Sequence, residues 1–396
     1  MPLDPTDLQV YAHFQRALRR TRLRTQAPDE AERIAKRFGL GKVAARILAA
    51  RGYKADERAA NYLNPTLKNG LPRPEALKDL DKACVLIAKT IEAKRSIAVC
   101  CDFDVDGLSG GAIVTHFLRS MGVKVEVFIP DRFVDGYGLN QDVIRKISKA
   151  GFGLMIAIDY GTTNFAELAL AKELKLATIV VDHHHVGAEI PVADAFINPN
   201  QKGCGFGDGV LCAAGLAWYL VLGLRKHLPQ AVQIDVKSYL DLACLGTLCD
   251  MVPLVGVNRV IARRGLELLD ATERVGLQAL KAVAGIQKKI TCTHVGFGLG
   301  PRLNAAGRMV HGEVVMELLT TEDRDRAGKL ARKLNKLNLE RQDTEAHIKE
   351  LAIKQVENKK ELPWGLVIWD KGFHTGVIGC LLYTSDAADD LLCVDL

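Results

Sequence analysis

The sequence predicts an α/β fold: a parallel sheet with helices on both faces, a long connecting helix, and the start of a second, smaller α/β domain. Three observations support this prediction. From about residue 81, short apolar runs rich in β-branched residues alternate with amphipathic stretches. A long polar stretch with helical spacing of its apolar residues covers 322–360. Another apolar run, at 362–370, is typical of a first strand.

Residues 1 to about 80 form a basic region with a helical pattern. Pro65, Pro72 and Pro74 interrupt any regular element near its end. Five arginines lie between residues 16 and 24. This cluster suits either a solvated helix face or a patch that contacts a phosphate backbone.

Four apolar runs predict the strands of the sheet, at 96–101, 123–129, 154–158 and 177–182. The helices between them are predicted from amphipathic stretches near 109–121, 140–150 and 164–174. Strands that alternate with helices indicate βαβ units and therefore a parallel sheet. In such sheets ligands bind beyond the carboxyl ends of the strands, so the residues that follow each run are the first candidates for a site.

The remainder of the chain is predicted to be mainly helical. Residues 210–290 follow a helical pattern, and 322–360 form one long helix that bridges two domains with a basic outer face. The apolar positions of this long helix are Ala327, Leu330, Ala331, Leu334 and Leu337.

Composition excludes several classes of protein. Apolar residues make up 48% of the chain and charged residues 25%, with a mild net charge of +6. No apolar run reaches the roughly 18 to 20 residues of a membrane span, and the first residues lack a signal-peptide core. We therefore expect a cytoplasmic protein without a membrane partner. The ten cysteines contain no CxxC pair, which argues against a zinc ribbon or a disulfide framework.

Acidic and imidazole side chains follow three of the predicted strands. They are Asp102, Asp104, Asp106, Asp159, Asp182, His183, His184 and His185, with Asp250 further along the chain. Oxygen and imidazole ligands suit Mn²⁺ or Mg²⁺. Clustered carboxylates raise one another's pKa unless a cation lies among them. Two divalent ions would remove that repulsion, and paired ions can support in-line displacement at phosphorus.

Each of these segments alone has an ordinary explanation. DxDxDG also occurs in turns and calcium loops, and Asp106 could cap the helix that follows. Asp159 precedes a Tyr-Gly pair, as turn acids often do, and Asp250 could be a plain loop acid. Their conjunction within one α/β unit favours a metal site.

Four segments, in this order, resemble the signature motifs of the DHH phosphoesterases: CDFDVDG, AIDYG, VVDHHH and GTLCDMVPL. Four more resemble the RecJ family of bacterial single-strand-specific 5′→3′ DNA exonucleases: IPDRFVDGYGL, FINPN, LGPRLNAAGRM and KGFHTGVIG. The resemblance runs from about residue 40 to 379. It implies a helical region at 1–80, a DHH catalytic domain at 81–255, a helical segment and linker helix at 256–361, and the start of a DHH-associated C-terminal domain at 362–379.

The resemblance also implies a reaction: hydrolysis of single-stranded DNA from a 5′ end by two Mn²⁺ or Mg²⁺ ions, with release of 5′-mononucleotides, in DNA repair and recombination. The implied metal ligands are Asp102, Asp104, Asp159, His183 and Asp250, with Asp159 bridging the two ions. His184 is expected near the scissile phosphate as a catalytic residue. Asp182 is expected to be a ligand or an orienting acid, and Asp106 and His185 are left outside the ligand set.

A second implied set binds the substrate. It comprises Arg132, Arg302, Asn304, Arg308, His374 and Gly376. An arginine can hold two phosphate oxygens at once, so Arg132 and Arg308 are expected to grip the 5′-phosphate and backbone, although Arg308 could instead be a structural cap. Single-strand-binding protein and a helicase are the expected protein partners.

The sequence departs from the family pattern at two positions and at its end. Cys100 stands where a histidine is common and is expected to be a buried thiol, and Tyr160 stands where Asn or Cys is common. The tail CLLYTSDAADDLLCVDL resembles a translated sequencing adapter, so we expect residues 380–396 not to be native. We accordingly expect Mn²⁺ binding with poor processivity.

Two alternatives remain open. A smaller DHH phosphodiesterase would act on short oligonucleotides or cyclic dinucleotides. A non-catalytic replication scaffold is disfavoured, because degenerate members of the superfamily lose ligands that this chain keeps.

Overall fold

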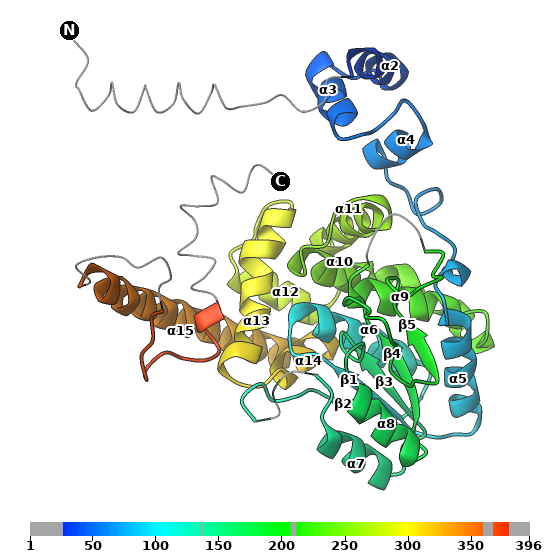
Figure 1. Cartoon of the computed structure of the whole chain (residues 1–396), viewed down its shortest axis with the longest axis vertical. Helices are drawn as coiled ribbons and strands as arrows, with labels where there is room; N and C mark the ends of the chain where they lie inside the picture. The colour runs from blue at the N-terminus through cyan, green and yellow to red at the C-terminus, as the bar shows by residue number, and fades with distance from the viewer. Residues whose placement is uncertain (1–26, 135, 137, 207–210, 359–366, 380–396) are drawn as a thin grey trace. The chain divides into compact units, whose positions relative to one another are not determined.

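The computed structural model describes residues 27–134, 136, 138–206, 211–358 and 367–379. Three expectations fall outside this part of the chain: the arginine cluster at 16–24, the beginning of the strand expected at 362–370, and the tail from 380. The chain divides into two compact units, residues 1–70 and 71–396 (Figure 1).

The described part of the first unit, residues 27–70, contains three short helices: α2 (Pro28–Phe38), α3 (Lys42–Ala50) and α4 (Glu57–Leu63). Gly39 ends α2 in the left-handed region at φ 63°, where glycine has no Cβ penalty. Asp56 caps α4 by accepting a hydrogen bond from the amide of Ala59. The helices enclose a small core of their own, formed by Ile34, Ala45, Leu48, Tyr53 and Ala59. The helical prediction for this region is confirmed where the structure describes it.

The second unit is built on a five-stranded parallel sheet with the order β2-β1-β3-β4-β5. Its strands are β1 (Ile97–Cys101), β2 (Val125–Phe128), β3 (Leu154–Ile158), β4 (Ala177–Val181) and β5 (Ala195–Ile197). The four predicted strands are confirmed, with ends within two residues. The three-residue β5 was not predicted, because a run this short carries no recognisable alternation.

Helices cover both faces of the sheet (Figure 1). Those that connect successive strands are α6 (Val105–Ser120), α7 (Gln141–Lys149) and α8 (Phe165–Glu173). On one face, Cys100 and Ala157 pack with Ile144 and Ile147 of α7 and Leu168 of α8. The opposite face contacts α6 and two further helices, α5 (Leu80–Glu92) and α9 (Ala213–Leu224). The predicted two-faced α/β layering is confirmed.

The strand order positions the site. The chain leaves β1 toward β2 on one side, and then crosses to β3 on the other side of β1. The connection that follows β1 and the connection that follows β3 therefore leave the carboxyl edge of the sheet in opposite directions. This divergence is the point where doubly wound sheets bind their ligands.

From Ala213 to Glu357 the described residues are mainly helical, as predicted for 210–290 and 322–360. The further α-helices are α10 (Leu240–Cys249), α11 (Gly256–Asp270), α12 (Val275–Val283), α13 (Gly300–Met309), α14 (Glu313–Thr320) and the 34-residue α15 (Arg324–Glu357). Short 3-10 helices lie at Pro74–Ala76, Pro229–Gln233 and Val236–Tyr239, and a π-helix at His294–Leu299.

Two sequence expectations can be checked on this part of the chain. All five apolar positions expected to lie inward on α15 are buried. Residues 367–370, the described end of the expected strand at 362–370, form no strand. Within the described residues, no helix combines the length and the apolar character needed to span a bilayer.

Candidate metal centre

The site begins where three neighbouring strands end. Asp102, Asp159 and Asp182 each follow the last residue of β1, β3 and β4. Their backbone amides donate to carbonyls of the adjoining strand at 3.2, 2.9 and 3.0 Å, so each extends the ladder by one position. The parallel register therefore places the three acids in a row along one edge of the sheet.

Two further acids belong to the first turn of α6. Asp104 is its N-cap, with Oδ1 accepting from the amides of Asp106 and Gly107 at 2.9 and 3.0 Å. The carboxylate of Asp106 instead reaches the start of α9, where it accepts from the amides of Ala213 and Ala214 at 2.7 and 2.9 Å. The expectation that Asp106 caps the helix after β1 was wrong, because Asp104 takes that position and frees Asp106 to turn inward.

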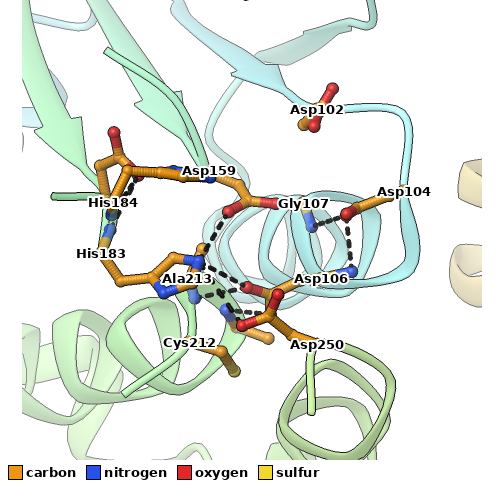
Figure 2. A network of polar contacts seen from close by, with 12 residues as sticks. Asp102, Asp104, Asp106, Gly107, Asp159, His183, His184, Cys212, Ala213 and Asp250 are labelled. Atoms are coloured by element: carbon orange, nitrogen blue, oxygen red, sulfur yellow. Dashed lines mark hydrogen bonds and ion pairs between the residues drawn. The ribbon is translucent and has the colours of Figure 1, made fainter. Parts of the chain in front are cut away.

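His183 gathers carboxylates from three different segments (Figure 2). Its Nε2 lies 3.3 Å from Oδ1 of Asp159, 3.6 Å from Oδ2 of Asp250 and 3.7 Å from Oδ2 of Asp106. Asp250 reaches this point from the C-cap of α10. The acids predicted from separate motifs thus converge on one imidazole.

Asp182 faces its own loop. Its Oδ1 lies 2.7 Å from both the amide nitrogen of His183 and Nδ1 of His184, and its Oδ2 accepts from the amide of Thr162 at 2.9 Å. Of the two roles left open for this acid, these contacts favour the orienting one. His184 is held at Nδ1 while its side chain stays 46% exposed. His185 is exposed and belongs to none of the candidate ligand groups.

Two asparagines that the sequence interpretation did not assign hold the histidine loop. Asn198 Nδ2 donates to the carbonyl of His184 at 3.0 Å, and Asn200 Nδ2 donates to the carbonyl of His183 at 2.6 Å. Both lie in FINPN, directly after β5. The sequence signal for these two asparagines is their position directly after a short apolar run. That signal is informative only if the run is recognised as a strand, and β5 was not predicted.

The electrostatics are those of crowded carboxylates. Burial, together with the charge of Asp104, raises the pKa of Asp102 to about 8. Burial, with Asp106 and Asp104, raises the pKa of Asp250 to about 7. The pKa of Asp159 is raised well above its ordinary value by burial and by the surrounding acids. This edge of the sheet therefore attracts positive charge.

The Asp182–His184 pair behaves in the opposite way. Burial alone would raise the pKa of Asp182, but hydrogen bonding and charge from His184, with hydrogen bonds from Thr162, lower it to about 2. The hydrogen bond to Asp182 in turn raises the pKa of His184. The pair therefore favours the ionised form of the carboxylate and the protonated form of the imidazole.

Three overlapping groups of side chains have the geometry to hold a metal ion. Within each group the ligand atoms lie within 4.8 Å of one another: Asp102, Asp104 and Asp159; Asp159, His183 and His184; and Asp106, His183 and Asp250. Asp159 belongs to two groups, and its two carboxylate oxygens would allow adjacent ions to share it. His183 also belongs to two groups, but an imidazole nitrogen binds a single ion. The donor set, all oxygen and imidazole, suits Mn²⁺ or Mg²⁺. Asp106 and His184 are the two members of these groups that were not predicted as metal ligands from the sequence.

Backbone geometry constrains the site closely. Asp159 has a φ of 68°, which is costly for a residue with a side chain and is typical of functional sites. Gly246 of α10 packs against Asp106, because a Cβ at this position would lie 2.3 Å from Asp106 Oδ1. Glycine here lets α10 approach the carboxylate without displacing it.

Four of the six predicted substrate-binding residues are linked by contacts beside the acids. Arg132 lies over the ring of Phe103, with Cζ 5.3 Å from the centroid. Arg308 Nη1 donates to the carbonyl of Gly376 at 3.3 Å, and the amide of Gly376 lies 3.2 Å from His374 Nδ1. The His374 ring contacts Phe133, the neighbour of Arg132, at 5.8 Å.

Asn304 and Arg302 have internal partners. Asn304 Oδ1 accepts from the amide of Val105 at 3.1 Å and so ties α13 to the start of α6. Arg302 Nε donates to Asn335 Oδ1 of α15 at 2.9 Å, and its Nη1 donates to the carbonyl of Gly298 at 2.7 Å. These bonds connect Arg302 to the long helix rather than to Asp102 and its neighbours.

The two departures from the family pattern lie in the core. Cys100 and Tyr160 are buried in the cluster that packs against α7 and α8. Burial raises the pKa of both groups well above their ordinary values. The expectation of a buried thiol at Cys100 is confirmed.

Known proteins match this arrangement. The family described as "DHH family, N-terminal domain" matches residues 96–247. The single-stranded-DNA-specific exonuclease RecJ of Bacillus subtilis is 34% identical over 352 residues, which cover 89% of this chain and 44% of that protein.

Two crystal structures are similar over most of the chain. RecJ of Thermus thermophilus in complex with Mn²⁺ has a TM-score of 0.79 at 28% identity and covers 92% of this chain and 52% of its own. An exonuclease RecJ bound to manganese has a TM-score of 0.72 at 31% identity and covers 80% of this chain and 78% of its own. The chain thus spans about half the length of the Bacillus and Thermus proteins.

Proposed function

The chain belongs to the RecJ family of DHH phosphoesterases, and we propose that it hydrolyses single-stranded DNA from a 5′ end with two divalent ions, releasing 5′-mononucleotides. The observation that carries this proposal is the convergence of Asp106, Asp159 and Asp250 on Nε2 of His183. Such a cluster of acids around an imidazole is electrostatically unfavourable without cations. The proposal therefore rests on geometry as well as on relatedness.

Related proteins support the choice of metal. RecJ structures have been determined with Mn²⁺ and with Mg²⁺. We assign one ion to Asp102, Asp104 and Asp159, and its neighbour to Asp159, Asp106, His183 and Asp250. Bound ions of this kind neutralise phosphate oxygens and lower the pKa of an attacking water.

The residues around the ions have separate tasks. Asp182 holds His184 by Nδ1 and raises its pKa, so the imidazole can present positive charge to a phosphate as negative charge develops. Arg132 and Arg308 suit the 5′-terminal phosphate, with His374 and Gly376 contacting the backbone beyond it. Asn304 and Arg302 support α13, through α6 and α15 respectively.

The wider biological role follows from the family. We propose that the protein acts in the cytoplasm in DNA repair and recombination, and that single-strand-binding protein and a helicase supply its single-stranded ends. Long single-stranded DNA is proposed over cyclic dinucleotides as the substrate, because the similarity to RecJ of Bacillus subtilis covers 89% of the chain and so extends well beyond the DHH domain at 96–247.

The test compares degradation of 5′-phosphorylated and 5′-hydroxyl single-stranded DNA in Mn²⁺ by the wild type and Asp159→Ala. We expect the variant to lose activity by at least about 1,000-fold. Asp142→Ala is the matched control, because Asp142 is an exposed acid of α7 away from the cluster. Equal activity of wild type and Asp159→Ala would contradict the two-metal assignment, and faster cleavage of dinucleotides than of long strands would favour the smaller phosphodiesterase class.

A further inference from the structure

The first unit has an unusual distribution of charge. Between Arg33 and Lys54 the sequence contains seven Lys or Arg residues and no acid, although the whole chain is nearly balanced at 53 basic to 47 acidic residues. The acids of the described part of this unit lie outside that stretch, at the start of α2 and of α4. Opposite charges are thus separated within a unit that has a hydrophobic core of its own.

The basic side chains gather around the hairpin that joins α2 to α3. Lys36 is in the last turn of α2, Lys42 is the first residue of α3, and Arg46 follows Lys42 by one helical turn. All three are exposed, and none forms an ion pair within the described residues. Arg33 and Arg37, by contrast, pair with Glu30 and Glu57. We call Lys36, Lys42 and Arg46 the hairpin cations.

A lysine at the start of a helix is locally unfavourable, because it adds positive charge to the positive end of the helix dipole. Among the described residues no side chain caps α3, and its first turn contains no acid. The backbone amides of this turn therefore add to the positive potential of the hairpin cations. An anionic backbone would be favoured at this surface by both contributions.

The aromatic residues indicate which nucleic acid fits. Single-strand binders stack bases on exposed aromatic rings. In the described part of this unit the aromatic residues, Phe38, Tyr53 and Tyr62, pack against the core, and the two tyrosine rings contact each other at 4.6 Å. Within residues 27–70 this basic surface has no exposed stacking platform, and a row of cations alone suits the regularly spaced phosphates of a duplex.

We propose that the hairpin cations form a second nucleic-acid site, which binds the phosphate backbone of double-stranded DNA independently of the metal centre. A lipid surface is a poorer fit, because α3 exposes only two large apolar side chains, Val43 and Ile47, and interfacial helices need a broad apolar face.

The test uses the full chain in EDTA, so that the metal centre does not contribute. Fluorescence anisotropy would measure binding to a blunt duplex of about two helical turns and to oligo-dT of equal length. The variant is Lys36→Glu with Lys42→Glu and Arg46→Glu. The matched control, Lys36→Arg with Lys42→Arg and Arg46→Lys, keeps the charge and changes the side chains.

We expect the glutamate variant to bind the duplex at least about tenfold more weakly, with the salt slope reduced by about 2 to 3. Binding of oligo-dT should change less than about twofold, and the control should bind both probes like the wild type. The variant Lys36→Gln with Lys42→Gln and Arg46→Gln removes the charges without reversing them. If its thermal midpoint of unfolding equals that of the wild type, weaker duplex binding by this variant is due to loss of charge and not to loss of folding. Three results would each overturn the proposal. The first is unchanged duplex binding by the glutamate variant, and the second is an equal loss of binding to oligo-dT. The third is charge-dependent binding of anionic vesicles without binding of the duplex.

Discussion

The metal-free protein should lose stability as the pH rises from 5 to 7. The pKa values of Asp102 and Asp250 are raised to about 8 and about 7, whereas an unfolded Asp titrates near about 3.9. Between these values the folded state keeps protons that the unfolded state has released. Raising the pH therefore shifts the equilibrium toward unfolding.

The size of the effect follows from the number of retained protons. Each one contributes about 1.4 kcal/mol per pH unit, so full retention of a proton by both groups over about two units corresponds to about 5.6 kcal/mol. The side chain of Asp250 is 26% exposed, and solvent screening reduces its share. We expect a loss of about 2 to 3 kcal/mol in the free energy of unfolding.

Urea denaturation in EDTA at pH 5 and pH 7 measures this loss. Asp102→Asn with Asp250→Asn provides the reference, because it removes the two titrating groups and keeps the shape of the side chains. As the pH rises, the free energy of unfolding of the wild type should fall relative to that of the variant. Saturating Mn²⁺ should stabilise the wild type alone. An identical pH dependence in both proteins would refute the assignment of raised pKa values to this cluster.

Three further changes test separate parts of the site. Gly246→Ala should weaken the affinity for Mn²⁺, measured by calorimetry, about 10- to 100-fold, because its Cβ would lie 2.3 Å from Asp106 Oδ1. Gly187→Ala, whose Cβ would have no atom within 4 Å, should leave the affinity unchanged. Equal affinities in the two variants would remove Asp106 from the ligand set. Asp182→Asn should lower the pKa of His184 and reduce kcat at pH 8 about tenfold or more. Its affinity for Mn²⁺ should change little, and a large loss of that affinity would instead make Asp182 a metal ligand. Arg132→Gln should raise KM for 5′-phosphorylated DNA about tenfold, whereas Arg145→Gln on the exposed face of α7 should leave KM unchanged. If Arg132→Gln lowered kcat and left KM unchanged, Arg132 would have a role other than binding the 5′-phosphate.

The core of this site could be predicted from the sequence because its parts follow buried strands. A parallel sheet brings the carboxyl ends of its strands to one edge, so Asp102, Asp159 and His183 could be grouped before their distances were known. Asp250 was grouped with them as an acid further along the chain, and its role as a ligand came from the motif resemblance, because α10 shows no period that would aim its C-cap at the sheet.

The rest depended on tertiary contacts. Asp104 and Asp106 differ by two positions, and local pattern cannot decide which caps α6; the amides of Ala213 and Ala214, more than 100 residues away, decide it. β5 spans three residues and escaped detection, and so did the asparagines that follow it. The apolar run at 362–370 matched a strand pattern, yet its described end forms none.

Anomalous diffraction from crystals grown with Mn²⁺ would locate the ions and so decide whether the acids hold two metals. We predict two peaks about 3.5 to 4 Å apart, with Asp159 between them, one beside Asp102 and Asp104 and the other beside His183 and Asp250. Both peaks should disappear in Asp159→Ala. A single peak away from these acids, or no peak at saturating Mn²⁺, would contradict the two-metal assignment.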